Sequence, residues 1–192
     1  MAITNNLPII EFSTSKSFEI WLRKNHKSSI GIWIKIFKKE SGKKTITYAE
    51  ALDVALCYGW IDSQKQSYDE QSWLQKFSPR TTKSIWSKIN IGHVERLINE
   101  GKMKPVGLEA VEKAKADGRW EKAYDSPSKM SVPEDFLKEL QKNKKATEVY
   151  KNLNKTNLYS IAFKLHTAKK AETREKRIKE IIIKLENGEK LQ

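Results

Sequence analysis

The sequence predicts an α+β protein with a small antiparallel sheet of about three strands flanked by helices, and an all-helical C-terminal part. Three observations favour this fold class. A β-branched and aromatic run lies at residues 30–37, two extended stretches follow at residues 60–77, and apolar residues recur at helical spacing beyond residue 130. With 192 residues, 38% of them hydrophobic and 32% charged, the chain is long enough to bury a core and too apolar to be disordered.

The first predicted elements are a helix and a strand. Thr14 and Ser15 are both candidate N-caps of the helix, which carries apolar residues at helical spacing and ends near Asn25. The run Ile30–Phe37 is rich in β-branched and aromatic residues, so it predicts a largely buried strand.

The next segment predicts a helix followed by a hairpin. Thr47 and Glu50 have the spacing of a capping box, in which each side chain bonds the backbone N–H of the other residue. Gly59 ends this helix as a left-handed cap. The stretches Trp60–Tyr68 and Gln71–Phe77 then predict two antiparallel strands.

Two further helices complete the predicted N-terminal part. Asn90 is the expected N-cap of a helix that runs to Glu100, and Gly101 ends it. Pro105 opens another helix, because proline has no N–H to lose at the first helical position, and this helix closes near Gly118.

The turn-rich stretch at residues 124–129 predicts a boundary between an α+β domain at residues 1–125 and a helical part at residues 126–192 that docks on it. Ser131 and Glu134 have capping-box spacing at the start of the helical part. Each of its three predicted helices has one apolar stripe, so the helices must pack to be stable. The stripes consist of Phe136, Leu137 and Leu140, then Leu158, Ile161, Ala162 and Leu165, then Ile178, Ile181, Ile182 and Leu185.

The chain is strongly basic, with 37 Lys+Arg against 24 Asp+Glu and a formal net charge of +13. This charge predicts weak binding to polyanions such as nucleic acid. Only six of the cations are arginines, and arginine is the side chain that contacts phosphates and bases in bidentate fashion. No apolar run is long enough for a transmembrane segment and the N-terminus has no signal-peptide pattern, so we expect a cytoplasmic protein.

Motifs for catalysis and for metal or cofactor binding are missing from the sequence. Cys57 is the single cysteine, and His26, His93 and His166 lie in three different elements. There is no glycine-rich phosphate loop and no G-x-S-x-G elbow. We therefore expect no cofactor, no metal and no catalytic residue, and a binding protein ahead of an enzyme.

Residues 58–90 combine three tryptophans with an arginine, a carboxylate on an extended segment (Asp62) and several hydroxyls. Aromatic faces beside cations can stack on bases or sugars, and a nearby carboxylate can orient the arginine. The same pattern fits a second interpretation, in which the tryptophans fill the core and the arginine pairs with the carboxylate. The predicted ligand-binding residues are Trp60, Asp62, Arg80, Ser84, Trp86 and Asn90.

A family resemblance is carried by several stretches along the chain, namely 49–53, 56–62, 77–80, 84–90, 94–97 and 101–103, and in the tail 168–170, 172–174 and 177–178. These stretches resemble the YdeI/OmpD-associated family, also called bacteriocin-protection proteins, from about Phe18 to Gly188. The resemblance implies a link to resistance against bacteriocins or cationic antimicrobial peptides. It implies no reaction, cofactor or catalytic residue.

Three functions stay open at this point. The first, which the resemblance favours, is a non-enzymatic bacterial stress or protection protein that acts by binding an unidentified ligand or protein partner. The second is a nucleic-acid-binding domain that uses the basic, Trp-containing segment at residues 80–90. The third is a small-molecule enzyme with a pocket at Asp62, Arg80 and Asn90. The sequence predicts no oligomeric state.

Overall fold

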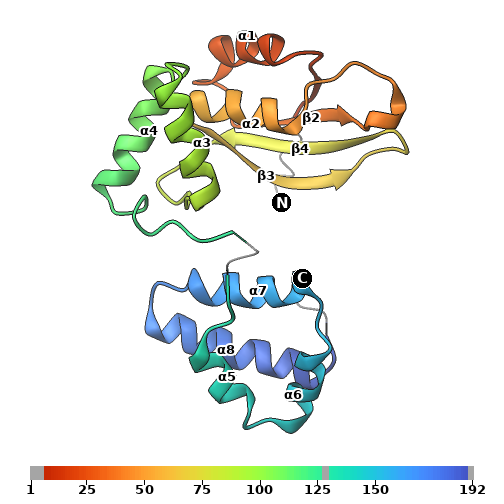
Figure 1. Ribbon diagram of the computed structural model, residues 1–192, viewed down its shortest axis with the longest axis vertical. Helices are drawn as coiled ribbons and strands as arrows, with labels where there is room; N and C mark the ends of the chain where they lie inside the picture. Colours follow the sequence, from red (N-terminus) through yellow and green to blue (C-terminus); the bar gives the residue numbers. More distant parts are fainter. Residues whose placement is uncertain (1–6, 127–129, 190–192) are drawn as a thin grey trace, which may run out of the picture. The chain divides into compact units, whose positions relative to one another are not determined.

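The structure, a computed structural model, describes residues 7–126 and 130–189. The chain divides into two compact units, one that ends at Ala123 and one that begins at Tyr124. The first unit contains a sheet and helices, and the second is helical (Figure 1). The predicted α+β class with a helical C-terminal part is therefore confirmed.

A four-stranded sheet with the strand order β1-β2-β4-β3 forms the centre of the first unit. Strand β2 (Ile32–Phe37) pairs antiparallel with β4 (Ser72–Pro79), and β4 pairs antiparallel with β3 (Trp60–Ser67), which confirms the predicted hairpin. Strand β1 (Ile9–Glu11) pairs parallel with β2. The sheet thus has one strand more than predicted and is mixed, because a three-residue strand is too short to show an alternating pattern.

Helices α1 (Ser15–Asn25) and α2 (Tyr48–Cys57) cover one face of the sheet (Figure 1). A short 3-10 helix, η1 (Lys39–Ser41), lies between β2 and α2, and α3 (Lys88–Asn99) and α4 (Pro105–Ala116) follow the hairpin. Buried apolar side chains of the strands and all four α-helices form one core. Its largest fully buried side chains are Phe18, Leu22, Ile32, Ile34, Ile46, Leu56, Trp60, Phe77, Trp86 and Leu97.

Local capping signals set most helix boundaries in this unit. Thr47 N–H donates to Glu50 Oε2 at 2.9 Å and Glu50 N–H donates to Thr47 Oγ1 at 3.2 Å, which confirms the capping box. Gly59 has φ +71° and ends α2 in the left-handed region, as predicted. The predicted cap at Asn90 is wrong, because Ser87 caps α3 and accepts the Asn90 N–H at 3.1 Å.

The second unit consists of α5 (Glu134–Leu140), α6 (Lys144–Lys151), α7 (Lys155–His166) and α8 (Ala171–Glu186). All three predicted apolar stripes lie on these helices. The core of the unit is formed by Phe136, Leu140, Ala146, Ile161, Leu165, Ile178, Ile181 and Leu185.

Two details of the second unit differ from the prediction. Helix α6 is an additional helix, which is short and begins where the Asn143 side chain accepts the Ala146 N–H at 3.0 Å. The predicted capping box at Ser131 and Glu134 is wrong, because α5 begins at Glu134 directly after Pro133 and has no side-chain cap bond.

Helix α4 packs unusually closely against the C-terminal end of α2. A Cβ atom at Gly107 would overlap the Cys57 carbonyl group, and Lys104 N–H donates to the same carbonyl oxygen at 3.1 Å. A Cβ atom at Gly59 would lie 3.1 Å from Val106 O. Two glycines thus allow the backbones of the α2 end and of α4 to approach each other.

We expect Gly107→Ala to lower the free energy of unfolding by about 1–3 kcal/mol, because the added methyl group has no space beside Cys57. Gly92→Ala in α3 is the matched control. A Cβ atom there meets no atom within 4 Å, so better helix propensity should raise the stability by about 0.5–1 kcal/mol. Urea unfolding followed by tryptophan fluorescence measures both effects, and equal stability of the two variants would contradict the packing argument.

Candidate functional site

A tight turn connects β4 to α3 and determines where the predicted site residues lie. Thr81 N–H donates to Ser84 Oγ at 2.9 Å, and Ser84 N–H donates to Thr81 O at 3.0 Å. Arg80 N–H donates to Gly59 O at 2.9 Å, so the turn is anchored beside the start of β3. These bonds fix the backbone on both sides of the Arg80 side chain.

The Arg80 guanidinium is stacked on a buried tryptophan. Its Cζ lies 3.4 Å from the ring centroid of Trp86, and its NH1 donates to Ile85 O at 3.1 Å. Trp86 is 2% exposed, and its ring centroid lies 4.9 Å from that of Trp120. A cation on an aromatic face, with one N–H bound to the backbone, has little remaining freedom.

Arg119 supports the same turn from the far end of α4. Its NH1 donates to Ser84 O at 3.0 Å, and its Nε donates to Asp117 Oδ1 at 2.8 Å. Arg119 and Trp120 are not among the site residues that the sequence predicts. Both follow α4, and no local pattern connects them with residues near position 80.

A pocket of about 300 Å³ opens beside the turn. Its charged side chains are Arg80, Lys113, Arg119 and Glu109, and Glu109 Oε1 lies 2.7 Å from Lys113 Nζ. The pocket therefore has an excess of positive charge. Its walls come from the end of α1, the α2–β3 junction, the turn after β4, and α4, and include His26, Tyr58, Gly59, Trp60, Pro79, Thr81, Thr82, Val106 and Ala110.

The structure brings some of the six predicted site residues together. Arg80, Ser84 and Trp86 belong to one turn, and Trp60 lines the same pocket as Arg80. Trp60 is 1% exposed and packs edge to face with Trp21, at 5.9 Å between ring centroids. The rings of Trp60 and Trp86 thus contribute mainly to the core.

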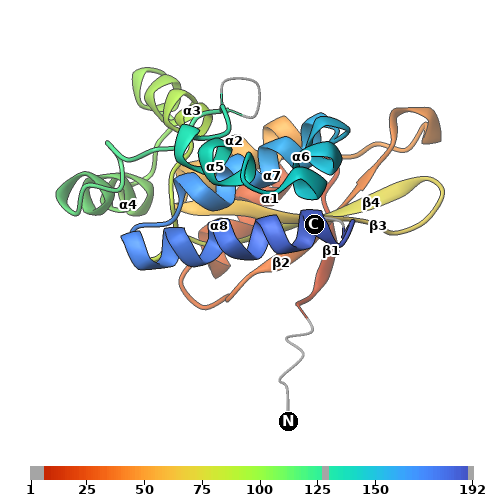
Figure 2. The same ribbon diagram turned by 90° about the horizontal axis from the view of Figure 1, so that it is seen from below.

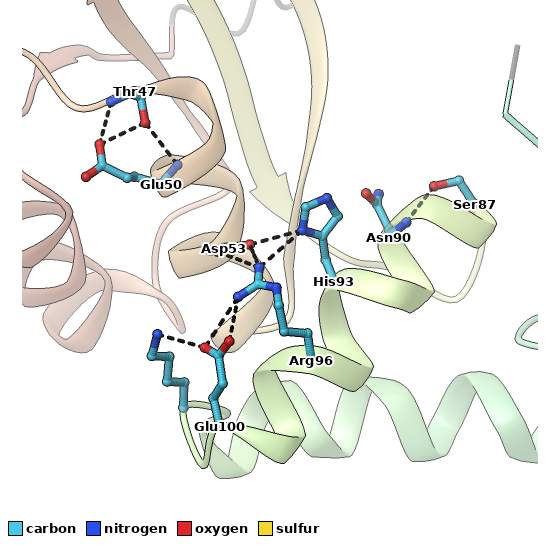
Figure 3. Close-up of polar contacts among 9 residues, drawn as sticks. Thr47, Glu50, Asp53, Ser87, Asn90, His93, Arg96 and Glu100 are labelled. Atoms are coloured by element: carbon cyan, nitrogen blue, oxygen red, sulfur yellow. Dashed lines mark hydrogen bonds and ion pairs between the residues drawn. The ribbon is translucent and has the colours of Figure 1, made fainter. Parts of the chain in front are cut away.

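Asp62 and Asn90 form their contacts away from the Arg80 pocket. Asp62 Oδ2 accepts a hydrogen bond from Tyr48 OH at 2.8 Å, which connects β3 with the start of α2. Asn90 lies in the first turn of α3 near Ser87 (Figure 3). Neither residue is among the described residues that line the Arg80 pocket.

A second polar group connects α2 with α3 (Figure 3). Arg96 NH2 lies 2.6 Å from Asp53 Oδ2, and its NH1 lies 3.2 Å from Glu100 Oε1. Lys102 Nζ lies 2.7 Å from Glu100 Oε2, and His93 Nδ1 lies 3.2 Å from Asp53 Oδ1. Hydrogen bonds to Asp53 and Glu100 raise the pKa of Arg96, and those from Lys102 and Arg96 lower the pKa of Glu100. This group of ion pairs holds two helices together.

A pocket of about 440 Å³ lies next to this polar group, with Cys57, Val54 and Leu97 among its lining residues. Burial raises the pKa of the Cys57 thiol to about 11. The thiol is therefore protonated near neutral pH and is a poor nucleophile.

Within residues 7–126 and 130–189, no group of three or more His, Cys, Asp or Glu side chains is arranged to hold a metal ion. No helix in the same part of the chain has the length and apolar character required to cross a membrane.

Two arginines of the tail cap helix α7 in the second unit. Arg174 NH1 donates to Leu165 O at 2.7 Å, and its Nε lies 2.6 Å from Asp135 Oδ2. Arg177 NH1 donates to Lys164 O at 2.5 Å. These bonds satisfy carbonyl groups at the end of α7 and connect α8 with α5. The stretches 172–174 and 177–178, which carry part of the family resemblance, thus have a structural role.

We expect Asp135→Asn to destabilise the second unit by about 1 kcal/mol at pH 7, a modest value because this ion pair is partly exposed. Hydrogen bonds from Arg174 lower the pKa of Asp135, so this stability is present above the ordinary Asp pKa and is lost as the pH falls through the lower folded value. The difference between wild type and Asp135→Asn should therefore shrink between pH 7 and pH 3.

All six tryptophans precede Ala123, so unfolding seen by circular dichroism but not by tryptophan fluorescence reports on the second unit. Glu139→Gln is a control, since its pair with Lys142 is an exposed contact within one turn. An Asp135→Asn effect that does not change with pH would contradict the assignment.

Two family models match the chain. Residues 10–110 match a model described as a domain of unknown function (DUF8412). Residues 129–188 match the model described as "Bacteriocin-protection, YdeI or OmpD-Associated". No curated protein and no solved structure matches the chain.

These matches confirm the predicted resemblance and locate it. The YdeI/OmpD-associated match covers the helical C-terminal region, whereas the stretches at residues 49–103 lie within the other match. The DUF8412 match covers more than half of the chain, so the protein belongs to the DUF8412 family and carries a YdeI/OmpD-associated region at residues 129–188.

Proposed function

We propose that this protein is a non-enzymatic bacterial stress or protection protein that binds an anionic ligand, or an anionic group of a partner, in the Arg80 pocket. The observation that carries the proposal is the Arg80 guanidinium, which lies 3.4 Å from the Trp86 ring centroid and lines a pocket of about 300 Å³. The family description of residues 129–188 supports the protective role.

The charges of the pocket favour an anion. Arg80, Lys113 and Arg119 supply positive charge, although Arg119 NH2 also lies 2.7 Å from Asp117 Oδ2. Glu109 is the single carboxylate among the described lining residues. Its Lys113 partner reduces the repulsion that this carboxylate exerts on an anion. A guanidinium that is already ordered by stacking loses little entropy when it binds a carboxylate or phosphate group.

Two side chains of types that can act in catalysis, Cys57 and Asp62, have structural surroundings in this fold. The Cys57 thiol is buried and protonated near neutral pH. The Asp62 carboxylate accepts a hydrogen bond from Tyr48 OH at 2.8 Å. These contacts support binding ahead of catalysis.

We expect Arg80→Gln to weaken the binding of small anions by about tenfold or more, because a hydrogen bond to a charged group contributes about 1.5–3 kcal/mol. The probes are inorganic phosphate, citrate and adenosine monophosphate, titrated by calorimetry. Lys83→Gln is the matched control, since Lys83 is exposed in the same turn and the charge change is equal. Equal losses in the two variants, or no binding of any probe by the wild type, would contradict an anion site at Arg80.

In cells, deleting the gene should raise sensitivity to a cationic antimicrobial peptide, because the protective binding is lost. Expression of wild type or Lys83→Gln should restore survival, and Arg80→Gln should not. Survival across a peptide dilution series measures this effect, with protein levels checked by immunoblot. Full restoration of survival by Arg80→Gln would show that protection does not depend on the Arg80 pocket. Unchanged peptide sensitivity of the deletion strain would contradict the protective role.

A further inference from the structure

The end of the sheet opposite to Arg80 carries two exposed segments that lie side by side. Residues 38–44 follow β2, and residues 68–71 join β3 to β4. Both segments lie at the same end of the sheet in two views (Figure 1, Figure 2). Lys38 N–H donates to Gln71 O at 2.8 Å, which fixes one segment beside the other.

Five lysines lie on and beside these segments, and we call them the lysine patch: Lys38, Lys39, Lys43, Lys44 and Lys65. All five are exposed, and none forms an ion pair with a carboxylate of the described residues. Two of the ammonium groups lie over aromatic rings. Lys43 Nζ is 4.8 Å from the Phe37 centroid, and Lys65 Nζ is 4.2 Å from the Trp73 centroid. A ring orders an ammonium group without neutralising its charge.

The carboxylates on and beside the two segments do not cancel this charge. Lys35 Nζ lies 3.1 Å from Glu11 Oε1 and 3.7 Å from Asp69 Oδ2, so these two carboxylates share a lysine outside the patch. Glu40 and Glu70 remain on the two segments, against five lysines. The surface is therefore net positive, and its charge is available to a partner.

We propose that the lysine patch binds the phosphate backbone of nucleic acid without reading its sequence. Lysine binds phosphate as a point charge, whereas bidentate contacts to base edges come mostly from arginine. Apart from Tyr68, the exposed residues between the lysines are polar or glycine, including Gly42, Gln66 and Ser67, so the surface lacks the set of apolar side chains that inserts into a bilayer. Tyr68, which is 51% exposed, supplies a ring on which an unpaired base can stack.

The test compares two variants of the full chain that lose the same charge. The patch variant carries Lys→Gln at positions 38, 39, 43 and 44, and the control variant carries Lys→Gln at positions 138, 144, 145 and 155. The control lysines are also exposed and form no ion pair with described residues, but lie in the second unit. Fluorescence anisotropy with a labelled 20-nucleotide single strand and a 20-base-pair duplex gives the affinity at several salt concentrations.

We expect the patch variant to bind about tenfold more weakly or worse, with the log–log salt slope on duplex reduced by up to about three to four, because each phosphate contact contributes about 0.9. The control variant should keep most of the affinity. A single strand that binds more tightly than the duplex, with the difference lost in Tyr68→Ala, would identify single strands as the target. Equal binding of the single strand and the duplex would show that the patch contacts only the phosphate backbone.

Three outcomes would overturn the proposal. Equal losses in the patch and control variants would show that only net charge matters. An absence of binding by the wild type at low salt would exclude nucleic acid. Tighter patch-dependent binding to vesicles of phosphatidylcholine with phosphatidylglycerol than to either nucleic acid would assign the patch to a membrane surface. The patch variant should bind inorganic phosphate and citrate as tightly as the wild type, because no patch lysine lines the Arg80 pocket, and this separates the inference from the proposed function.

Discussion

The N-terminal half of α4 lies directly against the chain that connects α2 with β3, and the Arg80 pocket depends on this close approach. Gly59 and Gly107 have no Cβ atoms, so backbone can contact backbone where larger residues would hold the elements apart. The approach brings Lys113 on α4, and Arg119 beyond it, to the same pocket as Arg80. A contact between two glycines and main-chain carbonyl groups thus determines where three cationic side chains converge.

Arginine and lysine have different roles in this protein. Four of the six arginines bind carboxylates or helix-end carbonyl groups: Arg96, Arg119, Arg174 and Arg177. Many lysines are exposed at the surface. This division follows from chemistry, since the guanidinium donates several hydrogen bonds in fixed directions and an ammonium group is mobile and strongly hydrated. The net charge of +13 is therefore mainly a property of surface lysines, while arginines build the fold and the pocket.

Local signals allowed correct predictions where one or two neighbouring side chains determine the backbone, as in the Thr47–Glu50 capping box and at Gly59. The cap prediction at Asn90 was wrong because Ser87, three residues earlier, is also a good cap residue, and its side chain accepts the Asn90 N–H. Arg119 was missed because it contacts Ser84 across 35 residues of sequence. The parallel strand β1 has three residues, and no periodicity can be read from so short a segment.

From the sequence, the tryptophans of residues 58–90 could either fill the core or belong to a binding site. In this fold, one tryptophan can have both roles. Trp86 is 2% exposed, so a base or sugar cannot stack on it, yet one face of its ring carries the Arg80 guanidinium. In the proposed anion site the ring acts on the ligand only indirectly, by holding the cation in place before binding. An aromatic and basic segment of this kind favours small anions. An exposed lysine surface such as residues 38–44 favours long polyanions, because phosphate chains gain affinity from many weak contacts.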